Sequence, residues 1–258
     1  MAFTSLSATS SSGTDQLTPS GYAQAAILDS GTTITLLPDD IASSVFEELG
    51  ATVSTQLNTV IVPCSLASNT GTLNYGFGGT GGPTIKVSIS QLVLPLTLEN
   101  GQTHETECQL GIQAAGDLPV LFGDTFLRSA YVVYDLDNNQ IALAQTNLNS
   151  TSSNVVTFAS RGASIPSATT APNQAQVTQT ASGVPHVESA TGSVATFNPT
   201  ATSFSAESGF TSTATSSSSS SKKNAGAGGP EPFRGAPWVV LGWMTTGLLV
   251  GMGGFSLL

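Results

Sequence analysis

The composition of the chain changes abruptly near Asn149, and this change limits how much of it can fold. Thirteen of the sixteen acidic residues precede Asn149, together with two basic ones, so the first 148 residues carry a net charge of −11. From Asn149 to Ser221 the sequence is mainly Ser, Thr, Ala, Pro and Gly, which offer too little apolar surface to offset the entropy lost on ordering. We expect one acidic domain over residues 1–148, large enough to bury a core, and a disordered stalk over residues 149–223.

The last part of the chain, residues 224–258, ends in an apolar stretch without charged residues, Trp238–Leu258. Small residues beginning at Asn224 and an 11-residue spacer, Ala227–Pro237, precede it. This order is the layout of a glycosylphosphatidylinositol (GPI) anchor signal, whose tail is replaced by a lipid. A tail of this length can also span a bilayer as a helix, although its five glycines weaken that helix. We expect lipid attachment at Asn224, with the next two residues as alternative sites and a membrane-spanning tail as the competing interpretation.

The side-chain inventory excludes several classes of function. Lys86 and Arg128 are the basic residues of the first 148, so little is available to neutralise phosphates and we exclude nucleic acid as a partner. Two cysteines and two histidines are too few for us to expect a Cys/His zinc site.

The N-terminal residues MAFTSLSATSSSGTD lack the basic and apolar regions of a signal peptide, so we expect none in this chain. Asn149-Ser150-Thr151 is the one N-glycosylation triplet of the sequence.

Hydrophobic periodicity predicts a mostly β domain with one substantial helix. Pro38–Gly50 starts with proline and two acids, carries apolar residues on one face and stops at glycine, which predicts a helix. The apolar run Ala25–Leu28 stops at a polar turn, which is typical of a buried strand, and residues 84–89 alternate as in a half-buried one. We expect regular structure from Gly21 onward. Further predicted elements are an edge strand at Leu92–Leu98 and a hairpin over Tyr131–Ala144.

Two segments about 95 residues apart carry the chemistry. Asp29-Ser30-Gly31-Thr32-Thr33 follows the first buried strand, and on its own it is equally well explained as a strand-ending turn. Pro119–Arg128 also has apolar residues before a glycine and leads into the Tyr131–Tyr134 strand. Together these segments resemble the C-terminal lobe of the pepsin-like aspartic proteases, over residues 1–146. Two further stretches resemble the fungal, surface-anchored (yapsin-like) branch: Tyr75–Gly79 and Leu92–Pro95.

The resemblance implies a fold and a role for each residue of the Asp29 loop. The implied fold is the mostly β, C-terminal lobe of a bilobal protease, in which a catalytic loop lies beneath a later strand that ends in glycine. Asp29 is similar to the second catalytic aspartate, and Gly123 is similar to the structural glycine of that crossing. Thr32 would donate its hydroxyl to the outer carboxylate oxygen, Ser30 would contact the other lobe, and Gly31 would let the backbone approach substrate and water.

Two positions of the second segment need separate interpretation. Phe122 stands where the family usually has an aliphatic residue, and we expect core packing to tolerate it. Asp124 belongs to the family's motif, and we interpret it as structural and not catalytic.

The chemistry of this family requires two carboxylates. Two that lie close together cannot both ionise, so one keeps a proton while the other acts as base toward a shared water; aspartic proteases are themselves the standard example. The implied reaction, hydrolysis of protein or peptide substrates, uses no cofactor and no metal. The sequence contains one such loop, so we expect the N-terminal lobe, with the first aspartate and the flap, to be missing and the chain alone to be inactive. The alternatives are a non-catalytic surface or cell-wall glycoprotein and a homodimer that pairs two Asp29 loops.

The two cysteines, Cys64 and Cys108, are 44 residues apart. As buried free thiols they would be ordinary. The family resemblance implies instead that they form the disulfide of the C-terminal lobe, which fits an oxidising compartment. With the anchor signal, this predicts a protein at the cell surface or in the cell wall, held to the plasma membrane by a GPI lipid.

Overall fold

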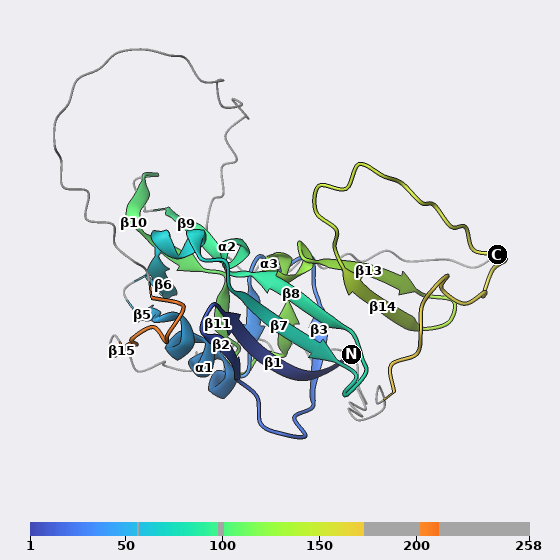
Figure 1. The fold of residues 1–258 in the computed structure, drawn as a ribbon, viewed down its shortest axis with the longest axis horizontal. Helices are drawn as coiled ribbons and strands as arrows, with labels where there is room; N and C mark the ends of the chain where they lie inside the picture. The colour runs from blue at the N-terminus through green and yellow to red at the C-terminus, as the bar shows by residue number, and fades with distance from the viewer. Residues whose placement is uncertain (56, 98–100, 173–201, 212–258) are drawn as a thin grey trace, which may run out of the picture. The chain divides into compact units, whose positions relative to one another are not determined.

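The structure is a computed structural model that describes residues 1–55, 57–97, 101–172 and 202–211. The chain divides into two compact units, Met1–Thr215 and Ser216–Leu258, and the second contains no described residue. The first unit is mostly β, as predicted (Figure 1). None of its described helices is long and apolar enough to cross a membrane.

The largest sheet has eight strands and contains the N-terminus of the chain. Its order is β11-β4-β12-β3-β1-β7-β8, and β2 pairs with β1 on the side opposite to β7. Strand β12 runs parallel to β3 and antiparallel to β4, so it lies between the two strands that flank the Asp29 loop. The strands are β1 Ala2–Ser10, β2 Gly13–Gln16, β3 Gln24–Leu28, β4 Thr35–Leu37, β7 Thr72–Phe77, β8 Thr84–Ser88, β11 Ile112–Ala114 and β12 Val120–Phe122.

A five-stranded sheet and a hairpin complete the β structure. The order of the five strands is β15-β5-β6-β10-β9, which places β9, with Pro95, at the predicted edge. The hairpin pairs β13 with β14 from Ala130↔Gln145 to Asp135↔Gln140. The strands are β5 Thr52–Ser54, β6 Thr59–Pro63, β9 Val93–Thr97, β10 Thr103–Leu110, β13 Ala130–Asp135, β14 Gln140–Gln145 and β15 Thr202–Ser203.

The predicted helix is α1, Asp39–Leu49. Two acids occupy its first turn, where they complement the helix dipole. It ends because Gly50 adopts φ 63°, a left-handed conformation that glycine tolerates best. The other helical segments of the described residues are single turns: η1 Cys64–Ser68, α2 Ile89–Leu92 and α3 Asp124–Leu127.

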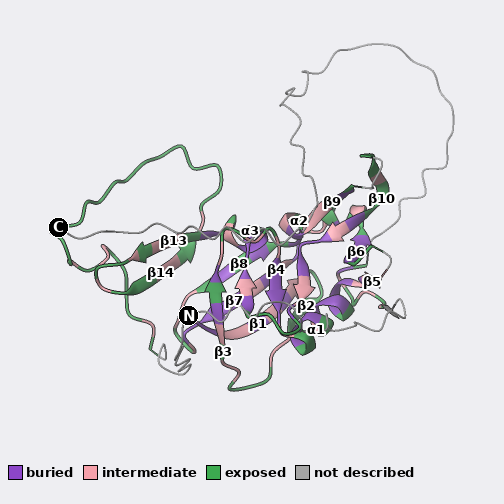
Figure 2. Ribbon diagram, turned by 180° about the vertical axis from the view of Figure 1, so that it is seen from behind, coloured by how far each residue is buried: buried purple, intermediate pink, exposed green. Residues whose placement is uncertain are grey.

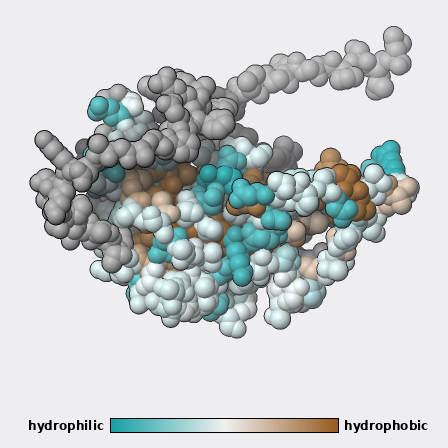
Figure 3. Space-filling view, turned by 45° about the horizontal axis from the view of Figure 1, so that its top comes forward, coloured by the Kyte–Doolittle hydropathy of each residue, from teal (hydrophilic) through white to brown (hydrophobic). Residues whose placement is uncertain are grey.

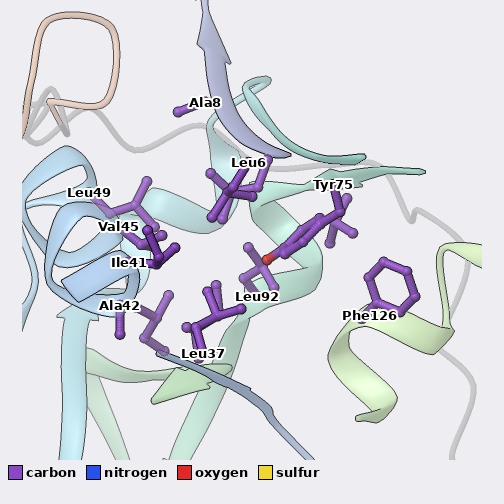
Figure 4. Packing of buried hydrophobic residues seen from close by; sticks show 14 of the residues in the cluster. Leu6, Ala8, Leu37, Ile41, Ala42, Val45, Leu49, Tyr75, Leu92 and Phe126 are labelled. Atoms are coloured by element: carbon purple, nitrogen blue, oxygen red, sulfur yellow. The ribbon is translucent and has the colours of Figure 1, made fainter. Parts of the chain in front are cut away.

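The core lies between α1 and the large sheet. Figure 4 shows Ile41, Val45 and Leu49 of α1 pointing toward Leu6 and Leu37 of the sheet. Beside them lies an aromatic cluster with ring centroids 4.6–6.2 Å apart. Phe122 is fully buried in this cluster, so the departure from an aliphatic residue is accommodated by packing. The members of the cluster are Phe3, Tyr75, Phe77, Phe122 and Phe126.

The structure corrects two sequence predictions. Regular structure begins at Ala2 and not near Gly21, because β1 is a central strand of the large sheet. Residues 202–211 fall within the predicted stalk, 149–223, yet Thr202–Ser203 form β15 and Phe210 is buried to 1% exposure. Burial of that aromatic ring gives this segment an apolar contact with the lobe. The predicted lipid site Asn224 and the apolar tail lie outside the described residues.

Candidate active site

The Asp29 loop begins where β3 ends beside β12. Leu28 pairs with Phe122 in the parallel register, and the Asp29 N–H donates to the Phe122 carbonyl oxygen at 3.0 Å. The apolar run before Asp29 therefore acts as a buried strand that fixes the position of its backbone.

A second set of hydrogen bonds joins the Asp29 loop to the turn after β12. The Asp124 N–H donates to the Thr32 carbonyl oxygen at 2.9 Å, and the Thr125 N–H donates to that of Thr33 at 3.2 Å. A Cβ atom at Gly123 would overlap the carbonyl oxygens of Thr32 and Ile34. The crossing of the two segments therefore requires glycine at position 123 because of close backbone approach.

The Asp29 carboxylate is half-buried and is held by its own loop. The Gly31 N–H donates to Oδ1 at 2.9 Å, and the Thr32 hydroxyl donates to Oδ2 at 2.5 Å. These bonds, with that from Thr32 the stronger, lower the pKa of Asp29 below its usual 3.8 and outweigh the opposing effect of desolvation. Ser30 is exposed on the same loop. The arrangement provides a fixed anionic oxygen pair at the surface of the lobe.

The negative charge of the Asp29 carboxylate acts on Tyr134 of the hairpin. Burial raises the pKa of the Tyr134 phenol, and the negative charge of Asp29 raises it further. The sequence predicted the hairpin but not this proximity, because the pairing of β13 with β14 says nothing about where the hairpin lies relative to β3.

The hairpin exposes large apolar side chains. Tyr131 is 64% exposed and Leu136 is 90% exposed, and Ile141 is exposed as well. Figure 2 shows the hairpin mainly in the colours of intermediate and exposed residues, and Figure 3 shows hydrophobic surface at the hairpin. An exposed apolar group of this kind is typical of a surface that another protein part covers.

The remaining predicted site residues lie away from Asp29. Cys64 and Cys108 form a disulfide, as predicted, with their Cα atoms 4.9 Å apart. Asn149 is exposed, just beyond β14, with φ 64°. Within the described residues, no group of three or more His, Cys, Asp or Glu side chains is placed to hold a metal ion.

Comparison with known proteins identifies the family. The family model for eukaryotic aspartyl proteases matches residues 3–146, which is more than half of the chain. The chain belongs to the eukaryotic aspartyl protease family. The matched range contains the Asp29 loop, the Gly123 crossing and the disulfide, so the site described above lies wholly within the family domain.

Three relatives in this family are fungal proteins. "Probable aspartic-type endopeptidase opsB" of Aspergillus oryzae is 39% identical over 208 residues, which are 79% of this chain and 41% of the relative. "Aspartic proteinase 3" of Saccharomyces cerevisiae is 35% identical over 160 residues, 62% of this chain and 26% of that protein. "Secreted aspartic protease 9" of Candida albicans is 39% identical over 121 residues, 46% of this chain and 21% of the relative. The chain therefore spans less than half the length of these proteases.

Among solved structures, the aspartic proteinase from Irpex lacteus matches with a TM-score of 0.43 and 25% identity. The match covers 59% of this chain and 44% of that chain.

Proposed function

We propose that this chain supplies one of the two catalytic carboxylates of an aspartic endopeptidase, and that Asp29 is that carboxylate. One observation carries the proposal: in a chain of the aspartyl protease family, Asp29 is fixed at the crossing of β3 and β12 with a hydrogen-bond donor on each carboxylate oxygen. Protein or peptide substrates follow from the family.

The hydrogen bonds to Asp29 suit the chemistry of the proposed reaction. Donors from Gly31 and Thr32 stabilise the anionic carboxylate, and this favours the form that accepts a proton from water. A second carboxylate at close range would retain a proton and donate it to the substrate carbonyl oxygen, because two such neighbours do not both ionise. The pair then titrates as a unit, as it does in aspartic proteases generally.

A second lobe is the proposed source of the other carboxylate. The relatives are more than twice as long as the stretch that this chain matches. The hairpin exposes Tyr134 and Ile141, which are register partners and therefore share one face. We infer that a partner lobe covers this apolar face. Ser30, which is exposed on the Asp29 loop, is then available to bond across the contact.

The experiment compares this chain alone with a fusion to the part of the Aspergillus oryzae relative that the chain does not match. Cleavage of an unfolded protein substrate is measured between about pH 3 and 7. We expect no cleavage by the chain alone and cleavage by the fusion. A folded fusion that binds but never cleaves substrate would favour the alternative, a non-catalytic surface glycoprotein that retains one lobe. Cleavage by the chain alone would favour a homodimer of Asp29 loops.

We also propose that the protein is a glycoprotein at the cell surface or in the cell wall, attached to the membrane by a GPI lipid at Asn224 and glycosylated at Asn149. The order of small residues, spacer and apolar tail supports the anchor. The exposure of Asn149 supports glycosylation. The disulfide supports an oxidising compartment.

The anchor is tested by expression in a fungal host with a signal peptide supplied. We expect phosphatidylinositol-specific phospholipase C to release the protein from membranes and a carbonate wash not to release it. Recovery of the Trp238–Leu258 peptide from the membrane-bound protein by mass spectrometry would show a spanning tail instead. Asn149→Gln should remove one glycan mass from the released protein.

A further inference from the structure

Residues 202–211 return to the lobe more than 50 residues after Asn149; we call Thr202–Thr211 the clasp. Strand β15 of the clasp pairs with β5, with Thr202 opposite Val53, and the Phe204 N–H donates to the Ala51 carbonyl oxygen at 3.0 Å. Figure 1 shows this segment in orange beside β5. The clasp therefore supplies the outermost strand of the five-stranded sheet and covers the edge of β5.

Phe210 anchors the other end of the clasp. Its side chain is 1% exposed and belongs to the main core cluster. Together with Leu49, Pro63 and Leu66, it lines a cavity of about 270 Å³. A Cβ atom at Gly71 would lie 2.6 Å from Phe210 Cε1, so the absence of a side chain there makes room for the ring.

Further hydrogen bonds fix the backbone of the clasp near Phe210. Asn69 Nδ2 donates to the Gly209 carbonyl oxygen at 2.8 Å, and Ser10 Oγ donates to that of Ser208 at 3.3 Å. The clasp is thus bound to the lobe through an edge strand, a buried ring and polar contacts to two other segments of the chain.

A buried carboxylate, that of Glu48, lies where the clasp crosses the end of α1. Glu48 is only 4% exposed, and its Oε1 atom has no hydrogen-bond partner. The clasp is joined to it by the Glu207 N–H, which donates to the Glu48 carbonyl oxygen at 3.1 Å, and the negative charges of Asp15 of β2 and Glu207 act on the Glu48 carboxylate. The described basic side chains, Lys86, Arg128 and Arg161, form no ion pair with Glu48. A buried carboxylate here faces two acids and no compensating cation.

We propose that the clasp is an acid-closed device: protonation of Glu48 allows it to lie closed on the lobe, and ionisation of Glu48 beside Glu207 and Asp15 opens it. Opening exposes Phe210 and the residues packed around it, and it leaves the edge of β5 unpaired.

The direction of the pH effect follows from the environment of Glu48. Burial, followed by repulsion from Asp15 and Glu207, raises the pKa of Glu48 from its usual 4.5 to about 7. The closed clasp is therefore most stable below about pH 4.5 and becomes less stable as the pH rises. Above about pH 7 closure bears the full free-energy cost of keeping an ionised Glu48 buried. If the clasp causes the entire change in the pKa of Glu48, the equilibrium constant for closure falls by at most roughly three-hundredfold from low to high pH. We expect about tenfold, because α1 and Asp15 remain near Glu48 when the clasp opens.

The experiment is amide hydrogen exchange on the full chain at about pH 5 and pH 8, corrected for the intrinsic rate at each pH. We expect the amides of Phe204 and Glu207 to be about tenfold more protected at the lower pH. Glu48→Gln should make their protection equal at both values, while Glu47→Gln, an exposed neighbour on the same helix, should keep the wild-type ratio. Phe210→Ala should remove protection from the clasp at both values.

The amides of β1 and β7 serve as the folding control for every variant, because these strands pair in the large sheet. Equal clasp protection at both pH values in the wild-type chain would overturn the proposal. If Glu48→Gln kept the wild-type ratio of amide protection between the two pH values, the proposal would be overturned as well. Free exchange of the Phe204 and Glu207 amides at both pH values would show that the clasp does not close at all.

Discussion

Removing the disulfide is expected to lower the stability of the lobe by a predictable amount. The bridge joins Cys64, directly after β6, to Cys108 of the neighbouring strand β10. Replacing both residues with alanine removes the bridge without leaving a free thiol that can form other pairs. Cys108 is in the core cluster and Cys64 packs against it, so alanine is a better replacement than serine at these sites.

The magnitude follows from the loop that the bridge closes. Cys64 and Cys108 are 44 residues apart in sequence. The chain-entropy relation for a loop of this size gives about 4 kcal/mol at 25 °C. For a lobe of roughly 150 residues, this corresponds to a fall in melting temperature of about 8–16 °C. The folded contacts of the strands β6 and β10 are retained in the variant, so the loss arises chiefly in the unfolded chain.

The assay is urea unfolding of the wild-type chain and the double variant, followed by thermal scans of both. Unfolding of the wild-type chain with and without a reducing agent provides a control that needs no substitution. A double variant within about 1 kcal/mol of the oxidised wild type would refute the entropic reasoning. Two free thiols in the secreted protein, found by mass mapping without reduction, would refute the bridge itself.

Three further substitutions test the site and the core. Gly123→Ala should cost about 1–3 kcal/mol in thermal unfolding, because its Cβ meets the carbonyl oxygens of Thr32 and Ile34; an unchanged melting temperature would contradict this packing. Thr32→Val should raise the pKa of Asp29 in an NMR titration, because a donor to the carboxylate is lost. The lowered pKa of Asp29 stabilises the fold above about pH 3.8 and ceases to do so as the pH falls, so the stability gap between Thr32→Val and wild type should close in acid. Phe126→Ala should cost about 3–5 kcal/mol by urea unfolding, because the ring is fully buried among other aromatic rings.

Local signals in the sequence predicted the elements that depend on local chemistry. The helix α1 follows from proline, two acids, an apolar face and Gly50, and each of these acts within a few residues. The buried strand before Asp29 follows from a short apolar run that stops at a polar turn. The disulfide was predicted only through the family resemblance, since two cysteines alone are compatible with free thiols.

Strand β1 was missed because its side-chain alternation is interrupted. Ala2 and Phe3 are adjacent and both buried, and the pairing with β7 shifts register between Phe3 and Ser5. A bulge of this kind breaks the period of two that identifies a strand. The many Ser and Thr residues of β1 also resemble those of the predicted stalk.

The clasp was missed because its stability depends on residues far away in the sequence. Phe210 lies in a Ser/Thr-rich segment, and the residues near it, Leu49, Leu66 and Gly71, are more than 130 positions away in sequence. A composition argument averages over the segment and cannot detect one aromatic residue that packs against such distant residues. The proximity of Tyr134 to Asp29 is likewise a consequence of tertiary structure.

The most direct test of the central claim is the rate of peptide cleavage by the fused two-lobe protein with Asp29→Asn. Asp124→Asn is the matched control, because Asp124 is an exposed carboxylate on the adjoining turn whose backbone, and not its side chain, contacts the Asp29 loop. We predict that Asp29→Asn lowers kcat by at least about a thousandfold while Asp124→Asn retains activity within about threefold. Cleavage by Asp29→Asn at the rate of the unsubstituted fusion would contradict the assignment of Asp29 as a catalytic carboxylate.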